Sequence, residues 1–152
     1  MKSAPLKILQ PTLWPRPKGF SHGIRARGQL LFVAGQIGWD TNGRFASERL
    51  ADQVKVALEN IVTVLAAGGA QPEHVTRLTW YVTSREDYYA QLKDIGANYR
   101  EVMGRHFPAM SVVQVVALME AAFLKQGFVN VMATLTFSDS TIRAFDSRLG
   151  FI

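Results

Sequence analysis

Hydrophobic and polar residues follow two different periods along the chain, and each period predicts one type of element. Segments 28–38 and 110–118 are nearly continuous apolar runs flanked by glycine or proline, which is typical of strands covered on both faces. Segments 74–83 and 127–137 alternate apolar and polar residues, as strands do when the two faces of a sheet differ. These four segments are therefore predicted to be strands.

Two further segments repeat apolar residues at the spacing of an α-helix. The first is predicted to begin after Ser47 as its N-cap and to end near Ala67, just before a pair of glycines. The second is predicted to begin after Ser84, because Asp87 lies three residues further on as in a capping box, and to run to about Met103. Each helix is expected to pack its apolar stripe against the sheet.

The elements predict a single α+β domain in the order β–β–α–β–α–β–β, in which the four segments above are the last four strands and the first strand precedes residue 28. Right-handed crossovers place both helices on one face of a mixed sheet. The other face then exposes side chains such as Tyr81 and Met132, which are poor solvent surface, so we expect other subunits to cover it. We place the domain at residues 18–137, between a Pro-rich basic lead at 1–17 and a polar tail at 138–152.

Composition and charge limit the classes of function. Cysteine is absent, the apolar runs are far shorter than the ~20 residues of a membrane helix, and no apolar h-region follows the N-terminus, so a cytoplasmic protein is expected. Residues 1–39 hold six basic groups and no acid, whereas the remaining residues hold eleven basic and twelve acidic groups. The basic segment is either a surface for RNA or acidic partners or a solvated edge, and we favour the solvated edge over nucleic-acid binding.

Five motifs resemble, in order, those of the RidA family (also called YjgF/YER057c/UK114). They are GFSHGI at 19–24, FVAGQIG at 32–38, LADQVKVALENIVTVLAAGGA at 50–70, VTRLTWYVTSREDY at 75–88 and FPAMSVVQVVAL at 107–118. The last of them corresponds to the family's Pro-Ala-Arg-Ser strand. The resemblance runs from about residue 18 to residue 135, which is nearly the whole predicted domain.

The resemblance implies a chorismate-mutase-like subunit that assembles as a homotrimer around a barrel-like core. Three clefts then lie between neighbouring subunits. Active members hydrolyse enamines and imines in these clefts, giving a keto acid and ammonia without any cofactor. An arginine of the Pro-Ala-Arg-Ser strand clamps the substrate carboxylate, and a glutamate on the last strand is thought to position or activate water.

The two residues that carry this chemistry in the family are replaced here. The clamp arginine maps onto Met110, which cannot form a bidentate pair with a carboxylate. The glutamate maps onto Asn130, which can hydrogen-bond water but cannot accept a proton at neutral pH. Because losing a charge-assisted pair typically costs about 2–5 kcal/mol in binding, ordinary 2-imino acids are expected to be poor ligands.

Further replacements make the predicted cleft less polar than that of the family. The resemblance maps a family tyrosine onto Phe20, a serine onto Ala34, an asparagine near Gly96 and a cysteine onto Val112. The predicted substrate-binding residues are Phe20, Ala34, Gly35, Gln36, Gly96, Met110, Ser111, Val112 and Met132. The predicted catalytic residues are Asn130 and His22, although His22 also fits a polar position at a subunit interface. The three histidines are too widely separated for a metal site.

The sequence therefore predicts a divergent RidA-like protein that either binds or hydrolyses a small neutral or carboxylate-masked imine or enamine. We weigh binding and hydrolysis equally. The alternative function is an RNA- or protein-binding trimer that uses the basic N-terminal quarter. Segment 119–126 is expected to extend the final hairpin beside the cleft, where Glu120 and Lys125 offer polar groups.

Overall fold

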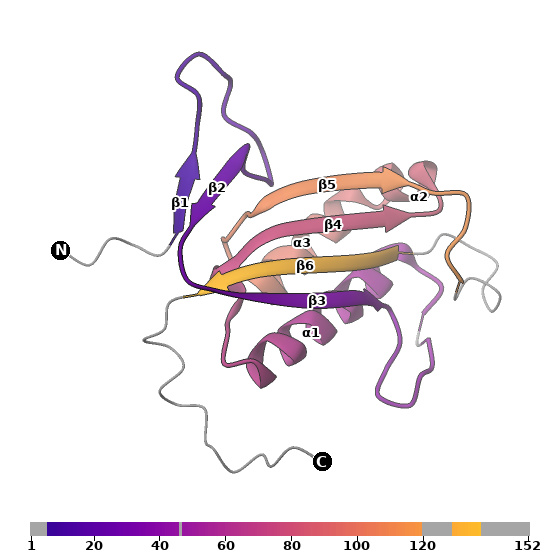
Figure 1. The fold of residues 1–152 in the computed structure, drawn as a ribbon. Helices are drawn as coiled ribbons and strands as arrows, with labels where there is room; N and C mark the ends of the chain where they lie inside the picture. The colour runs from indigo at the N-terminus through magenta and orange to yellow at the C-terminus, as the bar shows by residue number, and fades with distance from the viewer. Residues whose placement is uncertain (1–5, 46, 120–128, 138–152) are drawn as a thin grey trace, which may run out of the picture.

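The computed structural model describes residues 6–45, 47–119 and 129–137, which form an α+β domain (Figure 1). Its strands and helices, in chain order, are β1 Leu6–Leu9, β2 Gly23–Ala26, β3 Gln29–Ile37, α1 Leu50–Ala67, β4 Val75–Val82, α2 Arg85–Ala90, α3 Leu92–Met103, β5 Ala109–Gln114 and β6 Val129–Phe137. A short 3₁₀ turn at Pro72–His74 leads into β4. The Met119–Gln126 extension, apart from its first residue, and the C-terminal tail lie outside the described residues.

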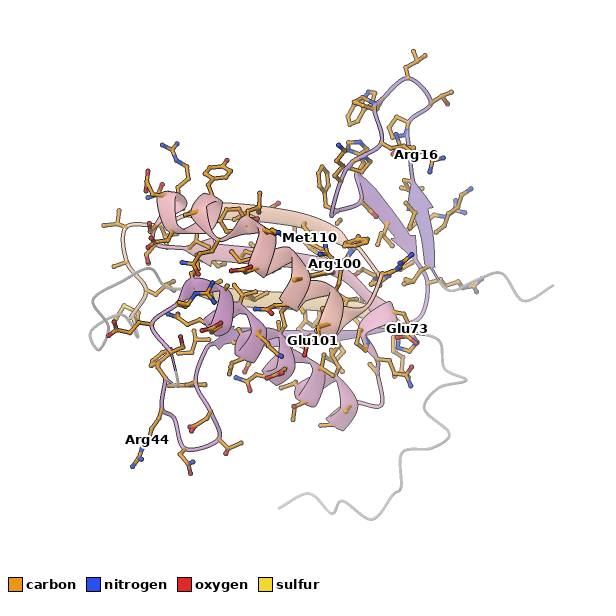
Figure 2. The ribbon with its side chains drawn as sticks, turned by 180° about the vertical axis from the view of Figure 1, so that it is seen from behind. Arg16, Arg44, Glu73, Arg100, Glu101 and Met110 are labelled. Carbon is orange, nitrogen blue, oxygen red and sulfur yellow. The ribbon has the colours of Figure 1, made fainter. Side chains whose placement is uncertain are left out.

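The main sheet is mixed and has the strand order β3-β6-β4-β5. β6 is antiparallel to both β3 and β4, whereas β4 and β5 are parallel and are connected through α2 and α3. The helices cover one face of this sheet, as the views from the front and from behind both show (Figures 1 and 2). The predicted α+β class, the mixed sheet and the helices on one face are therefore confirmed.

The hydrophobic core lies between the sheet and the helix layer. Leu58, Ile61 and Leu65 of α1 are fully buried there, in one cluster with Leu78 and Trp80 of β4. Burying a side chain of this size stabilises the fold by roughly 1.5–3 kcal/mol. The predicted period of two in β4 and the predicted stripe on α1 both follow from this packing, because each puts one apolar face toward the same core.

The face of the sheet opposite the helices carries exposed apolar side chains. Leu30 and Phe32 of β3 are 63% and 72% exposed, and Tyr81 on β4 is half-buried. A β-bulge between Val33 and Gln36 interrupts the pairing of β3 with β6. β3 and β5 form opposite edges of the sheet. The strands β6 and β4 therefore separate the bulge residues from β5 of the same chain.

A separate two-stranded sheet of β1 and β2 projects from one end of the domain (Figure 1). Its register places Lys7 directly opposite Arg25. The predicted element order has no strand in the Pro-rich lead, so β1 is an addition to it. The domain boundary predicted after residue 17 stays a prediction, although β1 pairs across it.

The ends of the helices differ from the prediction in two places. The cap of α2 is confirmed, because the Asp87 N–H donates to Ser84 Oγ at 3.1 Å. The predicted second helix, however, is broken at Gln91, which ends α2 and begins α3. The N-cap of α1 is Arg49 rather than Ser47, and the Gln91 Oε1 accepts a hydrogen bond from the Ala51 N–H at 2.9 Å. The Gln91 side chain, at the break between α2 and α3, thus accepts a hydrogen bond from one of the free backbone N–H groups at the start of α1.

β5 is shorter than the predicted strand, which extended to Leu118. It ends at Gln114, which pairs with the last residue of β4, Val82. One further hydrogen bond joins the Val115 N–H to the Val82 carbonyl at 2.9 Å, and Val116 beyond it is fully exposed. The apolar residues of segment 110–118 therefore continue beyond the end of β4, the strand that pairs with β5.

Candidate active site

A cavity of about 370 Å³ lies between α3 and the edge strand β5, and its volume is within the range of small-molecule sites. β5 contributes Met110 and Val112. These two residues pair with Leu78 and Trp80, so the period of two directs both toward the helix-covered face. Ser111, between them, belongs to the opposite face.

The second wall is one face of α3. Ile95, Gly96, Tyr99 and Arg100 all line the cavity, and their spacing places them on adjacent positions of one helical surface. A Cβ added at Gly96 would lie 3.4 Å from the Arg100 Nη1 atom, so the guanidinium group lies over the glycine. Figure 2 shows Arg100 and Met110 close to each other on the helix side of the sheet.

The third wall is the loop before β2, which hydrogen bonds hold against the start of β5. The Ser21 N–H donates to the Pro108 carbonyl at 2.9 Å, and Ser21 Oγ donates to the Phe107 carbonyl at 2.5 Å. Ser21 is itself only 6% exposed. These bonds place Lys18 and Phe20 at the cavity, so two of the sequence motifs build one site together.

Aromatic rings give the cavity a rigid apolar lining. Tyr99 stacks on Phe107 with ring centroids 5.5 Å apart, and Trp80 packs against Tyr99 at 6.3 Å. The Tyr99 hydroxyl donates to the His106 carbonyl at 2.7 Å, and burial raises its pKa well above the usual range. Tyr99 is therefore a neutral wall residue whose hydroxyl proton is already used, while the buried indole N–H of Trp80 has no partner among the described residues.

Three side chains bring polar groups to this lining: Lys18, Tyr88 and Arg100. No Asp or Glu among the described residues lines it. Burial raises the pKa of the half-buried Tyr88, so its hydroxyl stays protonated and can donate or accept a hydrogen bond at neutral pH. The site is thus apolar and cationic, with one phenol that makes no hydrogen bond within the part of the chain described.

The structure brings four of the predicted site residues together. Phe20, Gly96, Met110 and Val112 come from three separate segments and line the same cavity. Sequence reasoning missed Arg100, Lys18 and Tyr88. The only signal for Arg100 was its position four residues after Gly96, which places both on one helical face.

The other predicted substrate-binding residues lie elsewhere in the chain. Ala34, Gly35 and Gln36 lie at the bulge of β3, on the sheet edge opposite β5. Ser111 Oγ accepts a hydrogen bond of 3.4 Å from Arg77 Nη2. These residues do not share the cavity with Met110 in a single chain.

One of the two predicted catalytic residues, His22, is outside the cavity lining. His22 Nε2 lies 3.2 Å from the Pro15 carbonyl, and its ring packs edge-on against Trp14 and Phe20 at centroid distances of 5.0 and 5.6 Å. Asn130 occupies a backbone position in β6 between Ile37 and Tyr81. Met132, predicted to bind substrate, is on the same strand as Asn130 and pairs with Thr79 of β4.

Two further features of the described residues bear on the class of protein. No group of three or more histidine, aspartate or glutamate side chains in this part of the chain could hold a metal ion. None of its helices combines the length and the apolar character needed to cross a membrane.

Comparisons with known proteins agree on the family. The model of a family described as Endoribonuclease L-PSP matches residues 15–124. A RutC family protein of Pyrococcus horikoshii is 35% identical over 106 residues, which are 68% of this chain and 80% of the relative. The human 2-iminobutanoate/2-iminopropanoate deaminase is 27% identical over 109 residues, which are 71% of this chain and 77% of the human protein.

The solved structures lead to the same result. A protein of the conserved Rid family from Yersinia pestis, titled as having unknown function, matches with a TM-score of 0.75 and 29% identity, over 88% of this chain and 100% of that chain. The residues matched by the family model, 15–124, include the motifs that build the cavity. The chain is therefore a member of the RidA (YjgF/YER057c/UK114) family.

Proposed function

We propose that the protein binds and hydrolyses a small imine or enamine in the α3–β5 cavity. The observation that carries this proposal is the convergence of Phe20, Gly96, Met110 and Val112 on one cavity. These are four of the positions that the family resemblance assigns to its cleft. Relatives named as 2-iminobutanoate/2-iminopropanoate deaminases support the reaction type.

Hydrolysis of an imine needs few catalytic groups from the protein. Water adds to the carbon of the C=N bond, a proton moves to the nitrogen, and ammonia leaves as the carbonyl forms. A neutral hydroxyl that holds water or the imine nitrogen assists both steps. In this cavity the Tyr88 phenol is suited to that role, because it is half-buried, protonated and makes no hydrogen bond to another described residue. No cofactor is required in this scheme.

Substrate selection differs from that of the named relatives. Met110 offers no charge on the β5 wall, so a carboxylate attached directly to the imine carbon finds no bidentate partner there. The group beside Met110 is therefore neutral or carboxylate-masked. Little or no acceleration is expected for the imines that arise from dehydration of serine or threonine, and a coupled assay of keto-acid formation measures this. Rates equal to those of a relative that has the clamp arginine would show that the cavity is wrongly assigned.

We also propose that the working unit is a homotrimer. The bulge residues Ala34 and Gly35 belong to the family cleft by resemblance, yet they lie on the sheet edge opposite β5. Only a second copy of the chain can bring a bulge to the cavity of its neighbour. The exposed Leu30 and Phe32 on the face without helices support the same arrangement.

Phe32→Glu is expected to dissociate this assembly, because three carboxylates would converge in a dry interface. Light scattering at several protein concentrations measures the mass. Val64→Glu is the matched control, since Val64 is an exposed apolar residue on α1 in the helix layer. A wild-type monomer, or a trimer that survives Phe32→Glu, would contradict the proposed assembly.

A second candidate function, RNA binding without catalysis, has its own observation. Lys7 and Arg25 face each other on the β1–β2 sheet, and a second hollow of about 300 Å³ is lined in part by Arg16, Arg105 and His106. A salt titration with single-stranded RNA separates the two candidates. Phosphate contacts give an affinity that falls steeply with salt, whereas a small neutral ligand shows almost no salt dependence.

A further inference from the structure

Arg100 lines the cavity, and its charge forms no ion pair with any other described residue. Both acids of α3 are already paired, one with a residue of α1 and the other with Arg49, the residue before α1. Asp94 pairs with Arg49 at 2.5 Å, and Glu101 pairs with Lys55 at 2.6 Å. These pairs hold the two helices together and leave the guanidinium of Arg100 to the cavity.

Gly96 lies beside that guanidinium. A Cβ at position 96 would lie 3.4 Å from Arg100 Nη1, which is close to an ordinary van der Waals contact. The resemblance places an asparagine near this position in the family, and an asparagine would occupy the space. With glycine at 96, the Arg100 guanidinium lies next to the helix backbone at the cavity wall.

The geometry points to Arg100 as the anion anchor of the cavity, replacing from the helix wall the cation that is absent from the β5 wall. This inference rests on the proposed function and names its substrate class. The substrate is an imine or enamine that carries one carboxylate and an aromatic or branched apolar body. The carboxylate forms a planar pair with Arg100, and the apolar body lies against Met110 and the Tyr99–Phe107 stack.

The size and charge of the cavity agree with this class. Its volume of about 370 Å³ leaves more space than a three- or four-carbon imino acid fills, and five of its lining residues are aromatic. Lys18, on the loop side, adds a second positive charge and no acid opposes it among the described lining residues. Arg100 and Lys18 are both exposed, so an anion would pair with them at the solvent-facing rim of the cavity.

Calorimetry with stable ketone analogues tests the anchor. Phenylpyruvate has the carboxylate and the aromatic body, pyruvate has only the carboxylate, and phenylacetone has only the body. Wild type is expected to bind phenylpyruvate more tightly than either of the others. Arg100→Gln should weaken phenylpyruvate binding by about tenfold or more and leave phenylacetone unchanged, and Arg100→Lys should fall between.

Lys93→Gln is the matched control, because Lys93 is an exposed cation on α3 that does not line the cavity. It should change phenylpyruvate affinity by less than about twofold. Equal affinity of wild type and Arg100→Gln, equal losses in the Arg100 and Lys93 variants, or no phenylpyruvate binding by wild type would each overturn the inference. If the protein still hydrolysed neutral imines in those cases, the proposed function would stand without the Arg100 anchor. If it hydrolysed no imine at all, the proposed function would be wrong as well.

Discussion

Moving the cation from α3 to β5 is expected to convert the cavity into one that binds small 2-keto acids. The variant is Met110→Arg combined with Arg100→Met. Methionine and arginine have stems of similar length, so the new guanidinium should reach about where the thioether methyl ends and occupy the clamp position of the family. Desolvating a cation beside apolar walls offsets part of the gain, so a pyruvate dissociation constant of roughly 1 mM is expected.

Ligand-detected NMR suits affinities of this order and compares pyruvate with phenylpyruvate. The swapped variant should gain pyruvate binding and lose its preference for phenylpyruvate. Arg100→Met with Met110→Leu is the matched control, because it has the same change on α3 and no cation on β5. If a folded swapped variant binds pyruvate no better than this control, Met110 does not occupy the clamp position.

Much of the fold could be predicted because its elements pack one face each on a single core. The apolar stripe of α1 and the alternation of β4 are local patterns, and burial of Leu58, Leu78 and Trp80 converts them directly into structure. The break between α2 and α3 could not be predicted in this way. It depends on Gln91, whose side chain caps the start of α1 forty residues earlier in the chain.

The strand β1 shows a similar limit. It has only four residues and lies in a Pro-rich segment. Its partner β2 begins at Gly23, after the connecting residues 10–22. Short strands of this kind carry little periodic signal. Their existence is decided by the partner strand rather than by their own pattern.

The candidate site was predictable where motifs map residue by residue, and not where packing decides. Phe20, Met110 and Val112 line one cavity because they belong to motifs that the fold brings together, and their binding role stays a prediction. Arg100 looks like part of a solvated helix face in the sequence. Its place at the cavity depends on how α3 packs beside β5, which is a property of the folded chain.

Filling the cavity from the helix wall tests most directly whether the chemistry takes place there. Gly96→Trp places a large ring over the cavity, and Ala97→Trp places the same ring on the exposed surface one residue further on. Circular dichroism and thermal melting confirm that both variants fold. The rate to compare is ammonia release from the imine that wild type hydrolyses fastest in a panel of aromatic, branched and small imines.

The account predicts that Gly96→Trp loses this activity almost completely, because the ring excludes the substrate. Ala97→Trp should keep nearly the wild-type rate. Equal rates in the two variants, or a folded wild type that accelerates no imine in the panel, would contradict the assignment of the α3–β5 cavity as the active site.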